Sequence, residues 1–283
     1  MTERPNLATW VGKQQRSVDW LTPTRLAAWN VMLDLDVPFP QEGDPAPPSF
    51  HWTLFPPLER QSQLGADGAE RRGGFLPPVA LPRRMWAGSR LTFHQPILVG
   101  ERLEKISVIE KIEEKSGRAG ALVFVTVRHT ISGSRGAAVE EEQDIVYREA
   151  EGVGSASPGS AEPAPVGAWS REIVPTDVLL FRYSALTFNG YRIHYDRRYV
   201  TLEQGYPGLV VHGPLLATLL LDLARRQLPS ATVTRFRFRG IRPTFDTSPF
   251  EVRGGPGEAP GHVRLWSTDN QGRVGVEAEA WVR

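Results

Sequence analysis

Apolar and polar positions divide the chain into two similar series of elements. A helix is expected to begin at Thr22-Pro23, where a polar cap precedes proline and apolar residues then recur every three or four positions. Thr176-Asp177 begins a similar stretch in the second half. Each half is therefore predicted to be a helix followed by an antiparallel sheet. Strand-like alternation predicts strands at residues 101–114, 121–132, 140–149, 262–269 and 274–283.

A repeated proline segment relates the two halves further, and one extra helix distinguishes them. RLTFHQPILVGERL at 90–103 parallels RFRGIRPTFDTSPF at 237–250, and each proline is expected to bend a strand or mark its edge. A long apolar helix, predicted from Gly213-Pro214 up to Pro229, occurs only in the second half. Because this helix is apolar on almost every side, a sheet should enclose it.

The length and the loop composition predict two domains. A chain of 283 residues is about twice the size of a typical domain. Residues 151–167, EGVGSASPGSAEPAPVG, contain no large apolar side chain and read as a linker between domains at 1–150 and 168–283. Residues 38–48 and 65–74 are expected to be surface loops of the first half.

Composition excludes several classes of function. The net charge of +1 gives no reason to expect nucleic acid as a partner, and the most apolar run, residues 209–221, is too short to span a membrane. The absence of cysteine excludes disulfides and thiol chemistry and fits a cytoplasmic protein. From residue 167 onward there are 15 arginines and no lysine, so chemistry in this half depends on histidine, carboxylate, amide and arginine groups.

Two of the six histidines lie in a context that suggests chemistry. His194 follows Asn189 by five residues in LTFNGYRIHYD. His212 precedes Gly213 at the expected start of the long helix, where unpaired N–H groups and a missing side chain let a ligand oxygen approach. A base, an amide and an N–H cluster suit proton transfer beside a carbonyl group. His212 could instead fasten the strand to the helix.

These segments carry a resemblance to a known family. LTFNGYRIHYD followed by GYPGLVVHGPLL resembles the motif of MaoC-like (R)-specific enoyl-CoA hydratases, which have the hotdog fold. LPRRMWAGSRLTFHQPILVGERL resembles the N-terminal hotdog of the two-domain subfamily that contains mesaconyl-C(4)-CoA and itaconyl-CoA hydratases and mitochondrial 3-hydroxyacyl-thioester dehydratase type 2. The resemblance implies an α+β double hotdog, in which each half is an antiparallel sheet wrapped around a central helix. It also implies one active site per chain, in the C-terminal hotdog, with the N-terminal hotdog as its structural partner.

The resemblance also implies an activity. It points to a hydro-lyase that adds water reversibly to an α,β-unsaturated acyl-CoA, with a mesaconyl or itaconyl dicarboxylate expected first and a 3-hydroxyacyl thioester second. His194 takes the position of the catalytic histidine, and the N–H of Gly213 polarises the thioester carbonyl. Asn189 stands where the family has aspartate, and an amide can orient water but cannot accept its proton. No cofactor is expected besides coenzyme A in the substrate, and both a pseudo-dimeric monomer and a homodimer remain open.

Other residues are candidates for binding the substrate. Tyr191 and Arg192 replace the Asn-Pro of the family motif, and Arg192 or another arginine could anchor a substrate carboxylate. Arg239 and Arg242 could bind the phosphates of coenzyme A. Arg239 shares a predicted strand face with Arg235 and Arg237, and a solvent-exposed charged face is the alternative there. Three aromatic residues could cover an acyl tunnel or belong to the core: Trp52, Trp86 and Phe93.

Three further functions are alternatives to the hydro-lyase. A thioesterase would need an acid along the central helix, and Asp222 is the acid there. The amide at position 189 is the best argument for a protein that binds acyl-CoA without catalysis. A metal site formed by His194, Asp196 and His212 has workable ligands, but the spacing does not demand it.

Overall fold

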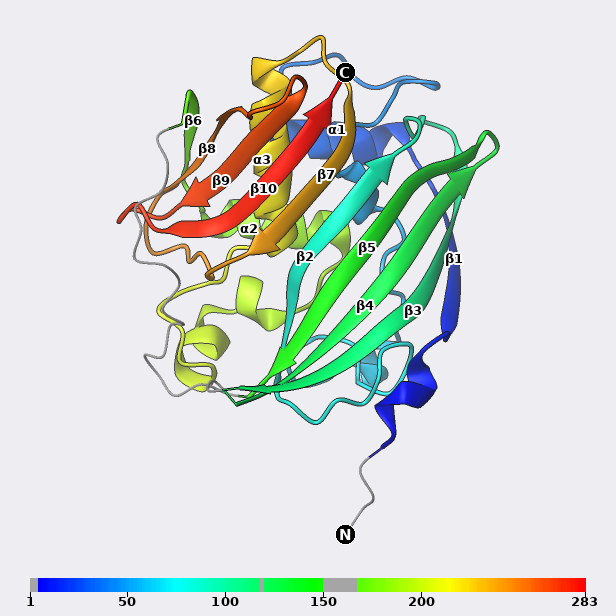
Figure 1. Ribbon diagram of the computed structural model, residues 1–283, viewed down its shortest axis with the longest axis vertical. Helices are drawn as coiled ribbons and strands as arrows, with labels where there is room; N and C mark the ends of the chain where they lie inside the picture. Colours follow the sequence, from blue (N-terminus) through cyan, green and yellow to red (C-terminus); the bar gives the residue numbers. More distant parts are fainter. Residues whose placement is uncertain (1–4, 118–119, 150–166) are drawn as a thin grey trace.

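Ten antiparallel strands form one continuous sheet in the computed structural model, which describes residues 5–117, 120–149 and 167–283 (Figure 1). The order β1-β3-β4-β5-β2-β7-β10-β9-β8-β6 repeats one arrangement outward from the central pair β2 and β7. The linker predicted at 151–167 lies, except for Gly167, outside the described residues. The strands are β1 (Gln14–Trp20), β2 (Arg83–Phe93), β3 (Arg102–Gly117), β4 (Gly120–Gly133), β5 (Gly136–Arg148), β6 (Trp169–Ile173), β7 (Val233–Gly240), β8 (Phe250–Pro256), β9 (His262–Thr268) and β10 (Val274–Val282).

An approximate two-fold axis passes between the two central strands. Strands β2 and β7 pair in antiparallel register, and Arg90 lies opposite Arg237, its counterpart in the sequence repeat. Like charges directly opposite each other would destabilise this pair. Acids on the neighbouring strands offset the repulsion, since Arg90 pairs with Glu142 and Asp144 and Arg237 pairs with Glu279. The repeat seen in the sequence is therefore a repeat in space.

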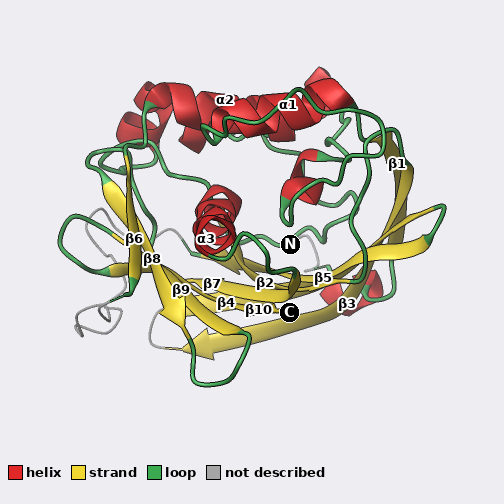
Figure 2. Ribbon diagram, turned by 90° about the horizontal axis from the view of Figure 1, so that it is seen from above, coloured by secondary structure: helices red, strands yellow, loops and turns green. Residues whose placement is uncertain are grey.

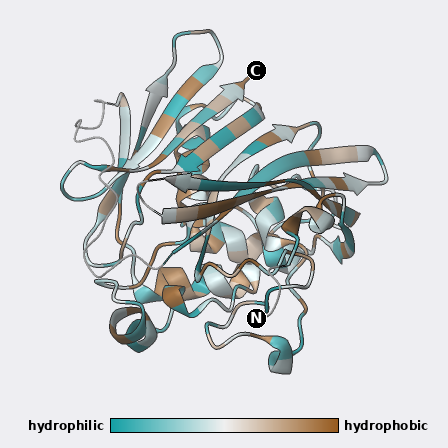
Figure 3. Cartoon of the chain, turned by 60° about the horizontal axis from the view of Figure 1, so that its bottom comes forward, coloured by the Kyte–Doolittle hydropathy of each residue, from teal (hydrophilic) through white to brown (hydrophobic). Residues whose placement is uncertain are grey.

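Alternation along the strands separates a core face from a solvent face. On β7, Phe236 and Phe238 are buried, whereas Arg235, Arg237 and Arg239 are exposed. Bands of hydrophilic and hydrophobic colour along the strands in Figure 3 follow the same period of two. The arginine face predicted from the sequence is thus the outer face of the sheet.

Three helices cover the inner side of the sheet (Figure 2). Helix α1 (Pro23–Met32) begins at the Thr22 side chain, which accepts a hydrogen bond from the N–H of Arg25, and α2 (Asp177–Thr187) begins in the same way at Thr176. Helix α3 (Gly213–Gln227) is buried from Leu215 to Ala224 and packs against β6, β8, β9 and β10. All three predicted helices are confirmed. None of the described helices is long and apolar enough to cross a membrane.

Two expectations about the halves are corrected. In each half an edge strand, β1 or β6, comes before the predicted helix; in the first half a short 3-10 helix, η1 (Leu7–Trp10), precedes that strand. The two edge strands carry only a short and partly exposed alternation, which gives little signal in the sequence. Pro96 and Pro243 do not bend strands, because β2 ends at Phe93 and β7 ends at Gly240. Both prolines lie in the turns that follow these two central strands.

The expectation that each half encloses a central helix holds only for the second half. Residues 33–82 of the first half form loops with two short 3-10 helices, η2 (Phe50–Thr53) and η3 (Gln61–Gln63). Figure 2 shows the long helix α3 on one side of the sheet's hollow, whereas short helical turns and loops lie on the other side. The inner face of β2 to β5 is therefore left partly uncovered, and it forms a wall of the cavity described below.

Candidate active site

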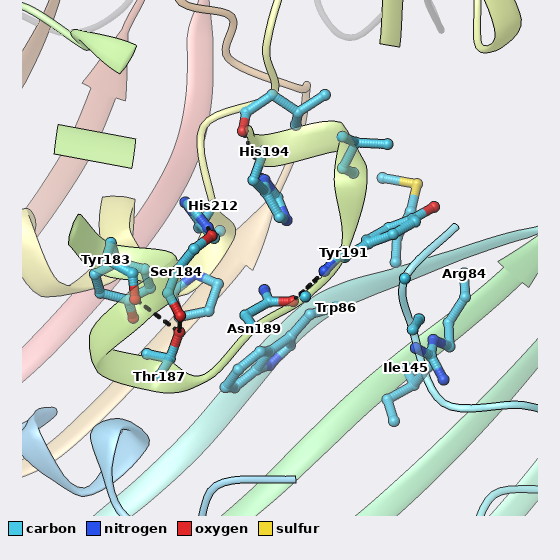
Figure 4. Close-up of a pocket in the computed structure, with 18 of the residues that line it drawn as sticks. Arg84, Trp86, Ile145, Tyr183, Ser184, Thr187, Asn189, Tyr191, His194 and His212 are labelled. Atoms are coloured by element: carbon cyan, nitrogen blue, oxygen red, sulfur yellow. Dashed lines mark hydrogen bonds between the residues drawn. The ribbon is translucent and has the colours of Figure 1, made fainter. Parts of the chain in front are cut away.

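A cavity of about 1100 Å³ lies between the two halves (Figure 4). Its lining comes from the inner face of β2 to β5, the end of α2 and the loop after it, the first residues of α3, and the turn after β7. Residues 68–70, from a loop expected on the surface, also line it, and the N–H of Arg192 donates to the Asp67 carbonyl beside them. Six of the predicted site residues meet in this cavity: Asn189, Tyr191, His194, His212, Gly213 and Arg242.

His194 presents one free ring nitrogen. It ends the 3-10 helix η4 (Arg192–His194), and its Nδ1 lies 2.7 Å from the carbonyl oxygen of Val210. A carbonyl only accepts hydrogen bonds, so Nδ1 carries the proton and Nε2 keeps its lone pair. Burial lowers the pKa of His194 to about 4, although the bond to Val210 opposes this shift. The imidazole is therefore neutral and can accept a proton through Nε2.

The turn after α2 fixes Asn189. Phe188 caps this helix in the left-handed conformation, with φ of 53°, and so reverses the chain just before Asn189. The Oδ1 atom of Asn189 accepts a hydrogen bond of 3.0 Å from the N–H of Tyr191. The side-chain nitrogen is left as a donor, and Figure 4 shows it on the side of the two histidines. This amide can hold a water or hydroxyl oxygen, but it cannot act as a base.

The ring of His212 stacks on the ring of His194. The two rings stack with their centroids 3.7 Å apart and an interplanar angle of 18°. Burial, together with the neighbouring His194, lowers the pKa of His212 well below its ordinary value, so both rings are neutral. The Nε2 atom of His212 shares a 2.9 Å hydrogen bond with the hydroxyl of Ser184 on α2. His212 therefore joins α2 to the start of α3 and supports the ring of His194.

The start of α3 offers a backbone donor to the cavity. Among the described residues, the N–H of Gly213 has no hydrogen-bond acceptor, and the next residue, Pro214, has no N–H. A Cβ atom built on Gly213 would meet only the carbonyl oxygen of Trp86, 3.9 Å away. An acyl oxygen can therefore approach this N–H, which also carries the positive end of the helix dipole.

Of the remaining residues predicted to bind the substrate, Tyr191 lies in the cavity and two arginines do not. Tyr191 packs edge-on against His194 with the ring centroids 5.8 Å apart. The structure does not bring Arg192 to the cavity, because its guanidinium binds Asp196 and the carbonyl of Ala66. Arg239 is also outside, paired with Glu277 on the outer face of the sheet.

The acids required by a metal site and by a thioesterase are engaged in other interactions. The carboxylate of Asp196 accepts hydrogen bonds from Arg192 and from the N–H of Tyr199, so it does not join the two histidines. No group of three or more metal-binding side chains is found in the part of the chain that the structure describes. Asp222 is buried in ion pairs with Arg171 and Arg226, and it does not line the cavity.

Two of the three aromatic candidates line the cavity. Trp52 and Trp86 pack edge-to-face with centroids 5.5 Å apart, whereas Phe93 does not line the cavity and packs beside His51. All three side chains also pack against the core. Sequence reasoning missed Arg84 and Ser184, which also line the cavity. The arginine stands in the RRMW segment that carries the family resemblance, but nothing in the sequence distinguishes it from Arg83.

Comparisons with known proteins agree with this geometry. A family model for hydroxyacyl-thioester dehydratase type 2 matches residues 49–246. The chain is 46% identical to a mesaconyl-C(4)-CoA hydratase of Chloroflexus aurantiacus, over 95% of this chain and 91% of the relative. The chain belongs to the hydroxyacyl-thioester dehydratase type 2 family. Its relatives are named as hydratases and dehydratases, and this member is accordingly a hydro-lyase.

Solved structures confirm the fold of this family member. A MaoC-like dehydratase matches with a TM-score of 0.74 at 17% identity, covering 98% of this chain and 99% of that one. A Mycobacterium tuberculosis protein described as a double hotdog matches with a TM-score of 0.57 at 14% identity, covering 96% of both chains. The predicted α+β double hotdog is thus confirmed.

Proposed function

We propose that this hydro-lyase adds water reversibly to an α,β-unsaturated dicarboxylic acyl-CoA of the mesaconyl-C(4) type. The observation that carries the proposal is the arrangement of a neutral His194, whose Nε2 is free to accept a proton, with the Asn189 amide and the N–H of Gly213 in one cavity. The 46% identity to a mesaconyl-C(4)-CoA hydratase supports the choice of substrate. Each chain would hold one such site.

The proposed reaction uses one proton acceptor for both steps. As the water oxygen bonds to the β-carbon, Nε2 of His194 takes a proton from that water, and the electron pair of the C=C bond moves to the thioester oxygen. The N–H of Gly213 stabilises the resulting enolate oxygen. His194 then returns its proton to the α-carbon, which completes the addition of H and OH and restores the neutral imidazole. No metal or redox group takes part in these steps.

A carboxylate on the substrate explains why an amide at position 189 suffices. The pKa of His194, about 4 in the free protein, makes it a weak base. A bound carboxylate near the imidazole would favour the imidazolium and raise that pKa. The charge that aspartate supplies in the family motif would then come with the substrate. Arg242, which lines the same cavity, remains our candidate for the phosphates of coenzyme A.

A panel of thioesters tests the proposed function. The absorbance of the enoyl thioester is followed with mesaconyl-C(4)-CoA, itaconyl-CoA, 3-methylcrotonyl-CoA and crotonyl-CoA, and in reverse with 3-hydroxyacyl-CoA. We expect the highest kcat/KM on the dicarboxylic substrate. Highest activity on the 3-hydroxyacyl thioesters would instead favour a dehydratase of fatty-acid metabolism. Tight binding without turnover of any member would overturn the enzymatic assignment in favour of acyl-CoA binding.

Asn189→Asp should shift the enzyme away from dicarboxylic substrates. One carboxylate oxygen can keep the bond to the N–H of Tyr191, but the other places a negative charge where an amide donor stood. Two unit charges about 5 Å apart repel by about 3 kcal/mol at an intermediate dielectric constant. We therefore expect kcat/KM to fall about 100-fold on mesaconyl-C(4)-CoA and to stay level or rise on crotonyl-CoA.

The matched control for this charge change is Asn270→Asp, in the exposed turn between β9 and β10. It adds the same charge far from the cavity lining and should leave both substrates unaffected. An unchanged ratio of the two kcat/KM values in Asn189→Asp would contradict a substrate carboxylate beside position 189.

A further inference from the structure

The cavity contains more positive charge than its function as a proton-transfer site requires. Three arginines and one lysine line its first-half wall: Arg83, Arg84, Lys105 and Arg148. Arg83 is engaged, because it donates to the hydroxyl of Tyr206 at 2.9 Å and lies over the ring of that residue. Arg84 and Lys105 form no ion pair with a carboxylate among the described residues, although the guanidinium of Arg84 lies beside the Tyr147 hydroxyl and opposes the rise that burial causes in the pKa of that group. A cation enclosed by protein without a counter-ion is costly and indicates an anionic ligand.

Arg84 lies in the same cavity as the reacting groups, on the strand whose Trp86 carbonyl faces Gly213. It lies two residues before Trp86 on β2, with the regular alternation kept between them, so both side chains point to the inner face. This spacing is about 7 Å along a strand. The carbonyl of Trp86 faces Gly213, and Tyr191, which packs against His194, lies within the electrostatic reach of Arg84. Figure 4 shows Arg84 on the far side of Tyr191 from the histidines.

Arg84, and not Lys105, is close enough to bind the free carboxylate of a short substrate. Lys105 is on β3, three strands away from β2 in the sheet, which corresponds to about 14 Å. A four-carbon dicarboxylic unit spans only about 5 Å from its thioester carbon to its free carboxylate. With the thioester oxygen at Gly213, the flexible side chain of Arg84 can reach that carboxylate, whereas Lys105 is too far away.

Glu70, an acid whose pKa responds to the charge of Arg84, does not neutralise that arginine. Burial and the neighbouring Glu59 raise the pKa of Glu70, while the charges of Arg84 and Lys105 oppose that rise. In the part of the chain that the structure describes, Glu70 feels the charges of both cations but forms no ion pair with either. The guanidinium therefore keeps donors for a ligand, and a planar guanidinium suits two-pronged binding of a carboxylate.

We propose that Arg84 binds the free carboxylate of the substrate and so makes the enzyme specific for dicarboxylic enoyl thioesters. This inference rests on the proposed hydration of such a thioester. The sequence alone suggests Arg192 or another arginine as the anchor of this carboxylate, and the proposal gives that role to Arg84.

The test compares Arg84→Met with Lys105→Met on two thioesters that differ in one group. 3-Methylcrotonyl-CoA has a methyl group where mesaconyl-C(4)-CoA has its carboxylate. For Arg84→Met we expect a loss of about 100-fold in kcat/KM on mesaconyl-C(4)-CoA and a change of less than about 3-fold on 3-methylcrotonyl-CoA. Arg84→Lys should recover part of the loss, and Lys105→Met, which also changes the cavity wall, should leave the ratio of the two kcat/KM values within about 3-fold of the wild type. Equal losses on both substrates, or an unchanged ratio, would overturn the proposal.

A binding measurement keeps this test separate from catalysis. Calorimetry with succinyl-CoA and butyryl-CoA compares a carboxylate with a methyl group in ligands that cannot be hydrated. The wild type should prefer succinyl-CoA by at least about 10-fold, and Arg84→Met should lose that preference. Hydration by the wild type with no such change in Arg84→Met would refute the role of Arg84 alone. A carboxylate preference that depends on Arg84, without turnover of any enoyl thioester, would refute the proposed hydration alone.

Discussion

His194→Asn should lower kcat for hydration by about 1000-fold while the protein remains folded. The amide nitrogen of asparagine can take the place of Nδ1 and keep the hydrogen bond to the Val210 carbonyl. Nothing then replaces Nε2 as proton acceptor, because the amide has no basic lone pair on its nitrogen. The measurement is the decrease of enoyl-thioester absorbance at saturating substrate, with thermal unfolding as the check on folding.

His94→Asn is the matched control. His94 is half exposed and pairs with Glu140 outside the cavity, so the same substitution there should leave kcat unchanged. Full activity in His194→Asn would remove His194 from the reaction. His194→Ala should lose as much activity as His194→Asn, since in both variants the missing group is the base and not the bond to Val210.

The same histidine determines the expected pH dependence. Burial lowers its pKa to about 4 in the free protein, and only the neutral ring can accept a proton. The kcat/KM for hydration should therefore be level from neutral pH down to about pH 5 and fall as the pH drops through about 4. With mesaconyl-C(4)-CoA, kcat should fall at a higher pH, because the bound carboxylate favours the imidazolium. With uncharged 3-methylcrotonyl-CoA the two profiles should coincide, and recovery of activity at neutral pH separates this loss from unfolding.

Local sequence signals were sufficient for the second half of the site. The proline after Gly213 and the apolar run behind it predict where α3 begins, and the free N–H follows from that position. Asn189 and His194 are likewise brought together by local structure, because the turn at Phe188 comes just before Asn189 and the helix η4 ends at His194. Both features depend on residues close together in the chain, which is why the sequence reveals them.

The first half contributes residues that depend on long-range packing. Arg84 becomes a candidate for substrate binding only because β2 passes the start of α3, more than a hundred residues later in the chain. Arg192 carries a local signal, but Asp196 four residues later neutralises it. The arginines of β7 could not be assigned without the sheet, since their period of two fits either face. A sequence pattern gives the side of an element, and the tertiary structure decides what that side meets.

The missing helix of the first half connects the fold to the chemistry. In the second half, α3 fills the hollow of the sheet with apolar side chains. In the first half, the inner face of β3 to β5 presents Ser107, His129 and Gln143 to the cavity, and these three are linked by hydrogen bonds. A polar wall of this kind does not suit a long alkyl chain, so it agrees with a short and polar acyl group.

Glu141→Gln should destabilise the protein by about 3 kcal/mol, because it removes the charge from a buried network. Glu141 is 3% exposed and binds His51 at 3.1 Å and the indole N–H of Trp52. Burial opposes its ionisation, but the hydrogen bond and charge of His51, the charge of His129 and a bond from Ser89 together lower its pKa to about 2. Chemical unfolding at neutral pH measures the loss.

The neighbouring Glu140→Gln is the matched control, since Glu140 points to the outer face and is half exposed; it should change stability by less than about 0.5 kcal/mol. The pH dependence of stability gives a second check. A carboxyl whose pKa falls from 4.5 to about 2 on folding stabilises the protein above pH 4.5, and that contribution disappears as the pH drops toward 2. The difference in the free energy of unfolding between wild type and Glu141→Gln should therefore shrink over this range. A constant difference would mean that the charge of Glu141 does not stabilise the fold.

Glu141 also supports the two tryptophans of the cavity. Because Trp52 binds Glu141 directly and Trp86 binds it through Ser89, Glu141→Gln should also raise the KM of the remaining folded enzyme.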